Sequence, residues 1–423
     1  MKIRKTLLSS VLSGMTALIL MLCSMEYPVK AEAGISGKNQ PKSAPAAEEN
    51  DIDQYIELHL HLDGAITQER QLLANAVDAA FTSAEVKASI RSQPVIDHPS
   101  AGMPSGENRR IIIDTDTAGD DALAILMAAK SPDITIEGVT VLQGNVSLEQ
   151  AADNALMTLE TAGCDAEVCL GAATALDGVK RKTFSVYGTD GMGDKGLIHP
   201  SGKPSDKDAV DFILETVEKY PDEIEIASIG PATNIANAIL KDPETMSHVK
   251  RIWSMGTAGL GPGNATPVAE FNVYKDAMAY NVMLDSGIDI TIVGLDICDK
   301  DGAVFDSNQL SDMENGNHVQ RYAALSFSKL LEFRRETRGI DNVNACDAVF
   351  MAALIWPGFV VDTLDCQASC IAHDDCEAFG EVIFYRPDIA YDSGRIVENT
   401  NVTLVTEVDL DHFFENVNIL IAK

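Results

Sequence analysis

Hydrophobic positions form alternating short and long blocks along residues 109–423. Short runs rich in β-branched residues, such as Ile111-Ile112-Ile113, are typical of buried strands, and longer apolar runs such as 122–129 are typical of helices. By the same criteria we expect further strands at 134–142, 166–170, 223–227, 249–254 and 288–293, and further helices at 148–161, 209–220, 232–240 and 276–286. This alternation predicts an α/β fold with a mainly parallel, Rossmann-like sheet covered by helices on both faces.

The first predicted strand ends in an acidic turn that contains Asp114, Asp116, Asp120 and Asp121. A surface turn with a helix cap explains one or two of these aspartates, but four crowd the start of one helix. The helix dipole, roughly half an elementary charge, cannot offset four negative groups. We therefore expect either a bound hard cation such as Ca²⁺ or Mg²⁺, or proton uptake by some of the carboxylates.

Other polar segments each follow a predicted strand. Asn145 follows the second strand, the segment 228–234 follows the fourth, and Met255 and Asp296 follow two later ones. Ligands of parallel sheets bind beyond the carboxyl ends of the strands. The chain order therefore predicts a single pocket at this edge, although Asn and Gly at strand ends also serve simply as turn formers.

The segment 263–272 carries the side chains that recognition of a polyol requires. Asn264, Glu270 and Asn272 combine amide and carboxylate groups, which supply directional donors and acceptors. The alternative is an ordinary polar loop. We favour a sugar site because Asn264, Glu270 and Asn272 match, at the expected spacing, the sugar-binding loop of the family that this chain resembles.

The acidic turn and this loop resemble motifs of the inosine-uridine nucleoside hydrolases. The signature of that family is Asp-x-Asp-x-Gly-x-Asp-Asp after a strand, and residues 114–121 read DTDTAGDD, with the glycine displaced by one position. Residues 188–193 resemble the family's mobile loop near the base, and residues 344–348 resemble the segment with its distal metal ligand. The resemblance covers residues 109–423 and implies the nucleoside hydrolase fold.

The resemblance also implies a Ca²⁺ site next to a ribose site. Asp116, Asp121, Asp347 and the backbone carbonyl of Ile229 would hold Ca²⁺, and Asp116 would act as general base on a water molecule. For Asp347 the structural alternative is a helix N-cap. Asp114 and Asp296 would support the site from behind. The residues that would position the sugar are Asp120, Asn145, Met255, Asn264, Glu270 and Asn272.

The chain departs from the family at the end of the site that faces the leaving base. Cys346 stands where many members have a histidine, and Tyr187 replaces another histidine. A departing base needs a proton or another form of stabilisation, so both residues are candidate catalytic groups. An inert buried thiol is the alternative for Cys346.

Residues 1–33 have the features of a secretory signal peptide. Lys2, Arg4 and Lys5 precede a largely apolar stretch, 7–21, and Ala-Glu-Ala at 31–33 is a plausible cleavage site. We therefore expect a secreted protein, or one in the cell envelope or periplasm; a retained membrane anchor is the alternative. Residues 34–108 have linker composition and are expected to be partly disordered.

Within that linker, residues 57–66 resemble the opening strand of adenosine deaminase. His59 and His61 are two positions apart, which places both imidazoles on one side of a strand where they can bind zinc. The rest of the chain does not continue the match. We therefore interpret the segment as a fragment without activity of its own, and a zinc nucleoside deaminase is the alternative.

The seven cysteines beyond the predicted signal peptide have no single interpretation. Cys164 and Cys169, together with Cys366, Cys370 and Cys376 near His373, can form disulfides in an oxidising compartment. Their spacing fits no zinc pattern well, which favours disulfides or plain buried thiols.

The formal net charge of −32 argues against nucleic acid as a partner, because phosphate backbones are bound by clusters of Lys and Arg. A neutral nucleoside is compatible with this charge. No stretch after the signal peptide is long and apolar enough to span a bilayer, so no membrane partner is expected. The family resemblance implies a homo-oligomer, a dimer or a tetramer.

Together these features predict a secreted, Ca²⁺-dependent hydrolase of nucleoside salvage, which cleaves the N-glycosidic bond of ribonucleosides to free base and ribose. A nucleoside-binding protein of the same fold with little turnover is the main alternative.

Overall fold

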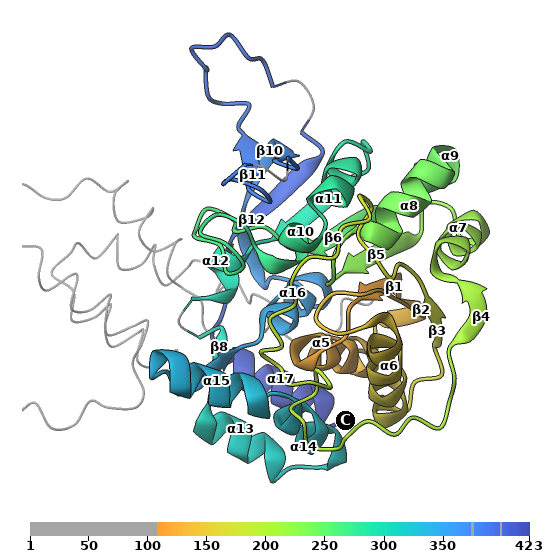
Figure 1. The fold of residues 1–423 in the computed structure, drawn as a ribbon, viewed down its shortest axis with the longest axis vertical. Helices are drawn as coiled ribbons and strands as arrows, with labels where there is room; N and C mark the ends of the chain where they lie inside the picture. Colours follow the sequence, from red (N-terminus) through yellow and green to blue (C-terminus); the bar gives the residue numbers. More distant parts are fainter. Residues whose placement is uncertain (1–107, 301, 374–375, 398–399) are drawn as a thin grey trace, which may run out of the picture. The chain divides into compact units, whose positions relative to one another are not determined.

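A ten-stranded sheet runs through the described part of the chain, in the order β11-β10-β12-β7-β6-β5-β1-β2-β3-β4 (Figure 1). The computed structural model describes residues 108–300, 302–373, 376–397 and 400–423. All strands from β12 to β4 pair in parallel, whereas β10 is antiparallel to both of its neighbours. The prediction of a mainly parallel α/β sheet is confirmed.

The elements have the following bounds. The strands of the large sheet are β1 (Arg109–Thr115), β2 (Ile134–Val141), β3 (Glu167–Leu170), β4 (Ser205–Asp208), β5 (Ile224–Ser228), β6 (Arg251–Met255), β7 (Ile290–Val293), β10 (Val360–Cys370), β11 (Val382–Tyr385) and β12 (Val402–Val408). A second, two-stranded sheet pairs β8 (Val304–Asp306) with β9 (Asn342–Asn344). The helices are α5 (Gly119–Lys130), α6 (Leu148–Ala162), α7 (Ala209–Lys219), α8 (Thr233–Lys241), α9 (Pro243–Met246), α10 (Phe271–Lys275), α11 (Ala277–Leu284), α12 (Leu295–Cys298), α13 (Ser307–Glu314), α14 (His318–Ser326), α15 (Ser328–Arg338), α16 (Cys346–Ile355) and α17 (Phe413–Ile421).

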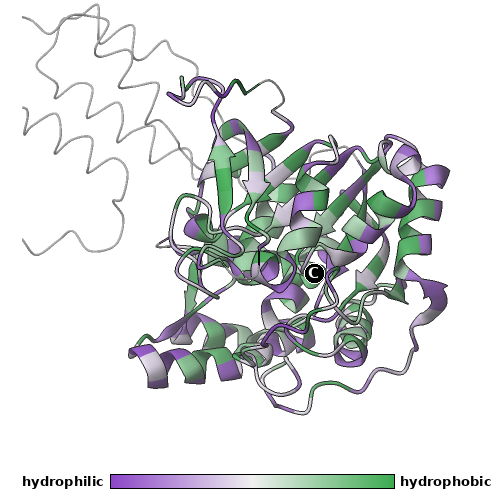
Figure 2. Ribbon diagram, turned by 45° about the horizontal axis from the view of Figure 1, so that its top comes forward, coloured by the Kyte–Doolittle hydropathy of each residue, from purple (hydrophilic) through white to green (hydrophobic). Residues whose placement is uncertain are grey.

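Helices cover both faces of the sheet because successive side chains of a strand point to opposite sides. On β1, Ile111 and Ile113 belong to one hydrophobic core, which includes residues of α5, α6 and α16. Ile112 belongs to the other core, with residues of α7, α8 and α11. Figure 2 shows hydrophobic residues along the central strands and hydrophilic residues on the outer sides of the surrounding helices. A strand that is buried on both faces reads as a continuous apolar run, as at 111–113.

The hydrophobic pattern did not predict the C-terminal part of the sheet. β10 alternates between exposed and buried residues and pairs in antiparallel fashion with β12. β12 then inserts beside β7, so the last strand in the chain lies well inside the sheet. Helices α13, α14 and α15 were also not predicted. Few residues of α13 and α15 are buried, and α14 is short and buries mainly small or polar residues.

Several sequence-based predictions concern residues 1–107, which lie outside the described residues. These are the signal peptide, the linker, and the deaminase-like segment with His59 and His61.

In the described residues, no helix has the length and hydropathy that a membrane crossing requires. The seven cysteines in this part of the chain are all free thiols, which excludes disulfides among them.

A buried ion pair joins β1 and β5 near their amino ends. Glu225 on β5 is 3 % exposed. Its carboxylate accepts hydrogen bonds from Arg109 Nε at 2.8 Å and from Trp253 Nε1 at 2.7 Å, and Lys250 Nζ lies at 3.3 Å. Burial by itself raises the pKa of Glu225, but these donors, chiefly Arg109, hold the pKa below its usual value. The carboxylate therefore links β1, β5 and β6 as a charged group.

We expect Glu225→Gln to lower the free energy of unfolding by about 3 kcal/mol, because it leaves the Arg109 guanidinium largely buried without a counter-charge. Urea unfolding measures the effect. The matched control is Glu223→Gln, which removes a carboxylate with 62 % side-chain exposure, 3.4 Å from Arg110. That exposed pair contributes under about 1 kcal/mol. Equal urea midpoints for the two variants would contradict a structural role for the Glu225 pair.

Candidate active site

The acidic turn between β1 and α5 is buried rather than exposed. Asp121 is 0 % exposed and Asp120 is 8 % exposed. One carboxylate oxygen of Asp121 accepts from Thr115 Oγ1 at 2.7 Å, and the other accepts from the backbone N–H of Ala118 at 2.8 Å. The displaced glycine of the turn, Gly119, packs so closely that a Cβ there would lie 2.9 Å from the Ser326 carbonyl oxygen. A glycine is therefore required at that position.

Asp347 joins the acidic turn from a distant part of the chain. It is the second residue of α16, whose N-cap is Ala345, so Asp347 does not serve as the N-cap. Carboxylate oxygens of Asp120, Asp121 and Asp347 all lie within 4.8 Å of one another. Burial, followed by repulsion between the charges, raises the pKa of Asp121 and Asp347 well above the usual value. Burial also raises the pKa of Asp120 to about 6.

Asp116 lies beside this cluster and is held by the end of β2. Its Oδ2 accepts the backbone N–H of Asn145, while its Oδ1 is buried without a hydrogen-bond partner. A Cβ on Gly144 would lie 2.1 Å from Oδ2, so only glycine leaves room for the Asp116 carboxylate. Burial raises the pKa of Asp116 to about 7, and its charge raises the pKa of Asp121.

These residues fit a hard cation. The carboxylates of Asp120, Asp121 and Asp347 are buried together, and no Lys, Arg or His in the described chain forms an ion pair with them. The orphaned Oδ1 of Asp116 adds an oxygen that lacks any donor. An all-oxygen set of this kind is what Ca²⁺ and Mg²⁺ prefer. Of the predicted ligands, Asp121 and Asp347 come together, and Asp120, predicted to bind sugar, lies in the same cluster.

Two predicted supporting residues lie behind the site. Asp114 is fully buried, and its Oδ1 accepts from Thr140 Oγ1 at 2.5 Å and from Asn234 Nδ2 at 2.8 Å. Asp296 accepts from the backbone N–H of Leu260 at 3.0 Å. Neither aspartate lines the pocket.

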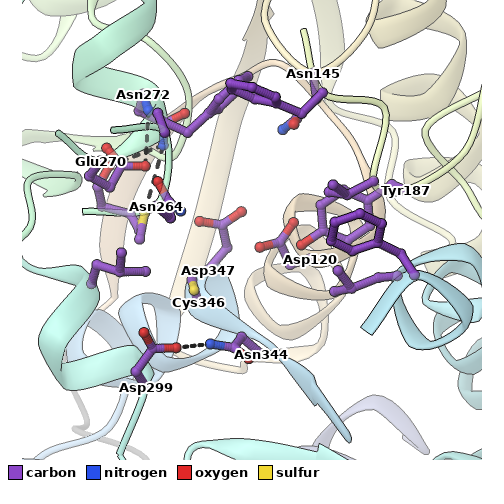
Figure 3. A pocket seen from close by; sticks show the side chains of 18 of the residues that line it. Asp120, Asn145, Tyr187, Asn264, Glu270, Asn272, Asp299, Asn344, Cys346 and Asp347 are labelled. Carbon is purple, nitrogen blue, oxygen red and sulfur yellow. Dashed lines mark hydrogen bonds between the residues drawn. The ribbon is translucent and has the colours of Figure 1, made fainter. Parts of the chain in front are cut away.

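The predicted sugar loop faces the cluster from the other side of the pocket (Figure 3). Glu270 is the N-cap of α10 and accepts the backbone N–H groups of Asn272 and Val273 at 2.9 and 3.2 Å. Burial raises the pKa of Glu270 to about 7. The Asn272 amide donates to the carbonyls of Ile229 and Met255 at 3.2 and 3.3 Å. The Asn272 side chain therefore ties the start of α10 to the backbone at the ends of β5 and β6.

These groups border a pocket of about 260 Å³, slightly below the roughly 300 Å³ at which small-molecule sites usually begin. The predicted site residues that line it are Asp120, Asn145, Tyr187, Ile229, Met255, Asn264, Glu270, Asn272, Cys346 and Asp347. The prediction of a single pocket for these strand ends therefore agrees with the structure. Asp116 and Asp121 lie just behind the lining.

The sequence analysis missed part of the pocket lining. The missed residues are Leu295, Asp299, Leu330, Phe333, Arg334, Arg338 and Asn344, together with Phe184, Val186, Ala265 and Phe271, the last two of which belong to the sugar loop. Four of these residues come from α15, which follows no strand of the large sheet. The spacing of Leu330, Arg334 and Arg338 by four residues was the available signal, because it places them on one side of a helix.

The two candidate groups for the leaving base lie in this part of the pocket. The Tyr187 hydroxyl forms a hydrogen bond with the Asp120 carboxylate, and the two side chains face each other in Figure 3. The Cys346 thiol is next to the Cys298 thiol, and this contact and burial raise the pKa of Cys346 well above its usual value. Cys346 is therefore a neutral thiol, which is a weak donor.

We expect the metal-free protein to lose stability as the pH rises from about 4 to about 7. The folded-state pKa values of Asp114, Asp116 and Glu270 are each about 7, whereas unfolded carboxyl groups titrate near about 4. Over this range the folded protein binds more protons, so rising pH favours unfolding. Thermal unfolding at about pH 5 and about pH 7.5 measures this loss of stability, and the difference between the two pH values should be smaller in Asp116→Asn. A dependence as large in that variant as in the parent protein would contradict this assignment.

Comparison with known proteins places these features in a family. Residues 111–415 match the family model described as inosine-uridine preferring nucleoside hydrolase. Uridine nucleosidase 1 of Arabidopsis thaliana is 38 % identical over 288 residues, which cover 65 % of this chain and 83 % of that protein. A non-specific ribonucleoside hydrolase of Escherichia coli strain SMS-3-5 is 33 % identical over 218 residues, covering 52 % of this chain and 71 % of that protein.

Solved structures agree with the sequence comparison. A plant nucleoside hydrolase superposes with a TM-score of 0.70 at 29 % identity, covering 74 % of this chain and 99 % of that chain. A purine-preferring ribonucleoside hydrolase from Gardnerella vaginalis gives a TM-score of 0.66 at 26 % identity, with 74 % and 98 % coverage. These comparisons do not support the deaminase resemblance at residues 57–66.

Proposed function

The chain belongs to the inosine-uridine preferring nucleoside hydrolase family, and from this premise we propose that it cleaves ribonucleosides with the help of Ca²⁺. Its membership makes it a ribonucleoside hydrolase, an enzyme that cleaves the N-glycosidic bond. The observation that carries the Ca²⁺ dependence is the buried group of Asp120, Asp121 and Asp347 beside the unpartnered oxygen of Asp116. We assign the ion to Asp116, Asp121, Asp347 and the carbonyl of Ile229, with Asp120 close enough to contribute.

The electrostatics of the pocket suit the transition state of this reaction. Cleavage of a glycosidic bond gives the sugar oxocarbenium-like positive charge. Asp116, Asp120 and Glu270 surround the sugar end with carboxylates that are already in place, so little reorganisation is needed when the charge develops. Bound Ca²⁺ would lower the pKa of a coordinated water and orient the ribose hydroxyls.

In this scheme Asp116 is the general base. The Asn145 N–H fixes its Oδ2, which leaves Oδ1 free of protein donors and able to accept a proton from water. Without metal, burial raises the pKa of Asp116 to about 7. Bound Ca²⁺ would lower this pKa and keep the carboxylate ionised, which is the state that a general base requires.

Several side chains are placed to hold the ribose. Glu270 is buried and fixed by two backbone N–H groups, so its carboxylate has a defined direction. The amides of Asn145 and Asn264 can both donate and accept, which matches hydroxyl groups. The Asn272 nitrogen donates to the carbonyls of Ile229 and Met255, which leaves its oxygen to accept from a hydroxyl. Met255 lies against Asn272, with its Sδ 3.6 Å from the amide nitrogen. We propose that these residues and Asp120 position the sugar.

No histidine is among the residues that line the pocket, so none of these residues is a histidine that could protonate the leaving base. Tyr187 and Cys346 remain our candidates for contact with the base, and both are protonated because burial raises their pKa values well above the usual range. Export by residues 1–33 and assembly into a homo-oligomer also remain predictions.

The hydrolase activity is tested by incubation with uridine, inosine, cytidine and adenosine, with free base, reducing sugar and ammonia measured together. We expect base and ribose in equal amounts and no ammonia. Asp116→Asn should lower kcat by about 10³-fold, because removal of a general base typically costs 10²- to 10⁴-fold. Asp153→Asn, at an exposed position of α6, is the control. Full activity in Asp116→Asn would refute its role, and ammonia without ribose would refute the hydrolase.

The choice of ion is tested by removing metal from the protein and adding back Ca²⁺, Mg²⁺ or Zn²⁺ separately. We expect activity to disappear on removal and to return with Ca²⁺. At a Ca²⁺ concentration about 100-fold above Kd, the folded state should gain about 2.7 kcal/mol, which thermal unfolding detects without any assay of activity. Asp347→Asn should weaken both effects. Unchanged activity after metal removal, or recovery with Zn²⁺ alone, would show that the proposed ion is wrong.

A further inference from the structure

The two ends of the pocket carry opposite charge. Asp120, Glu270 and Asp347 lie at the sugar end, near the polyol-binding loop. The cationic side chains that line the pocket, Arg334 and Arg338, both come from α15. The titratable groups nearest to the Arg334 guanidinium are Arg338, Asp299, Cys346 and Tyr187. Arg334 therefore faces the part of the pocket away from the sugar loop.

The wall around Arg334 suits a planar base. Leu330 and Phe333 provide apolar surface on the same helix, and aromatic and aliphatic walls with a few fixed polar groups are typical of sites for flat ligands. Phe184 lines the pocket on the side of the sugar loop, where it packs edge-on against Phe271 with ring centroids 5.9 Å apart. A nucleoside bound with its ribose at the carboxylates would extend its base into the part of the pocket around Arg334.

Not all N–H donors of Arg334 have a hydrogen-bond partner in the protein. Its Nη2 donates to Asn342 Oδ1 at 2.9 Å, which fixes the guanidinium from one side. Its Nε is buried and has no hydrogen-bond partner. Within the described chain no carboxylate forms an ion pair with it. The nearby carboxylate of Asp299 instead accepts the amide of Asn344 (Figure 3). A half-buried guanidinium with so few partners is costly unless a ligand uses it.

We propose that Arg334 contacts the nucleobase and stabilises the negative charge that the base gains as the N-glycosidic bond breaks. This inference rests on the proposed hydrolase function and adds a catalytic residue to it. Tyr187 is engaged with Asp120, and the neutral Cys346 thiol is a weak donor. Arg334 is a fixed cation with free N–H groups, and a guanidinium donates strongly to charged oxygen or nitrogen acceptors.

The step balances without any further reactant. The bond between C1′ and the base nitrogen breaks, and its electron pair leaves on the base. The oxygen of water bonds to C1′, and the proton that this water loses passes to Asp116. That proton finally neutralises the base anion, so nucleoside and water give ribose and the neutral base. The Arg334 guanidinium keeps its own protons and stabilises the anion by hydrogen bonding and charge.

The test compares a poor leaving group with a good one. Uridine and inosine need stabilisation of the departing base, whereas 4-nitrophenyl β-D-ribofuranoside releases a stable phenolate anion. For Arg334→Gln we expect kcat/KM on the nucleosides to fall about 10²-fold, as for the loss of one transition-state donor. Its activity on the nitrophenyl riboside should be unchanged, and this also shows that the variant is folded with an intact sugar site. Arg334→Lys keeps the charge and should recover part of the loss.

Arg335→Gln is the matched control. Arg335 is on the same helix but is exposed and pairs with Asp341, so this variant should retain the activity of the parent protein on both substrates. Equal losses in Arg334→Gln on nucleosides and the nitrophenyl riboside, or no loss on nucleosides, would overturn the role of Arg334 while the hydrolase function stands. A parent protein that is inactive on both substrates would overturn the proposed function and this inference together.

Discussion

Six carboxylates are buried at the carboxyl edge of the sheet, and none of them forms an ion pair within the described chain. They are Asp114, Asp116, Asp120, Asp121, Glu270 and Asp347. Burying a charge without a partner is costly, and the raised pKa values of these groups reflect that cost. Much of the local structure keeps these groups in place. Backbone N–H groups hold Asp116, Asp121 and Glu270, and glycines at 119 and 144 let the chain pack closely around them. A hard cation bound among the aspartates would remove most of the remaining repulsion.

The sheet explains why these groups meet. In the parallel register Asp114 on β1 lies beside Thr140 on β2 and Ser228 on β5, and Ser228 lies beside Ser254 on β6. The residues that follow these positions therefore emerge at one edge. The α16 helix then brings Asp347 to the same point, and α15 supplies a basic wall. The pocket is negative where the sugar becomes positive and basic where the base becomes negative, which is the polarity that glycosidic cleavage requires.

The same arrangement accounts for a site without the histidines found in many family members. Cys346 and Tyr187 are the residues that the sequence predicted at the corresponding positions; the Cys346 thiol stays neutral, and the Tyr187 hydroxyl is hydrogen-bonded to Asp120. The positive charge at the base end comes instead from a helix that follows no strand of the large sheet. Relatives of this chain include a uridine nucleosidase and a purine-preferring hydrolase.

The sequence alone determined the features that depend on neighbouring residues. Most strands and helices from β1 to β7 follow from local hydrophobic periodicity, the short elements β4, α9 and α10 excepted, and the acidic turn and the loop 263–272 follow from motifs only a few residues long. The antiparallel end of the sheet, the position of β12 beside β7 and the α15 wall depend on contacts between residues far apart in the chain. Likewise, Asp121 and Asp347 were predicted as metal ligands from the sequence. Only the folded chain shows that Asp120 lies with them and that Asp116 lies just behind the pocket. Local patterns record which side of an element is buried, whereas the distance between two carboxylates is decided by how whole elements pack.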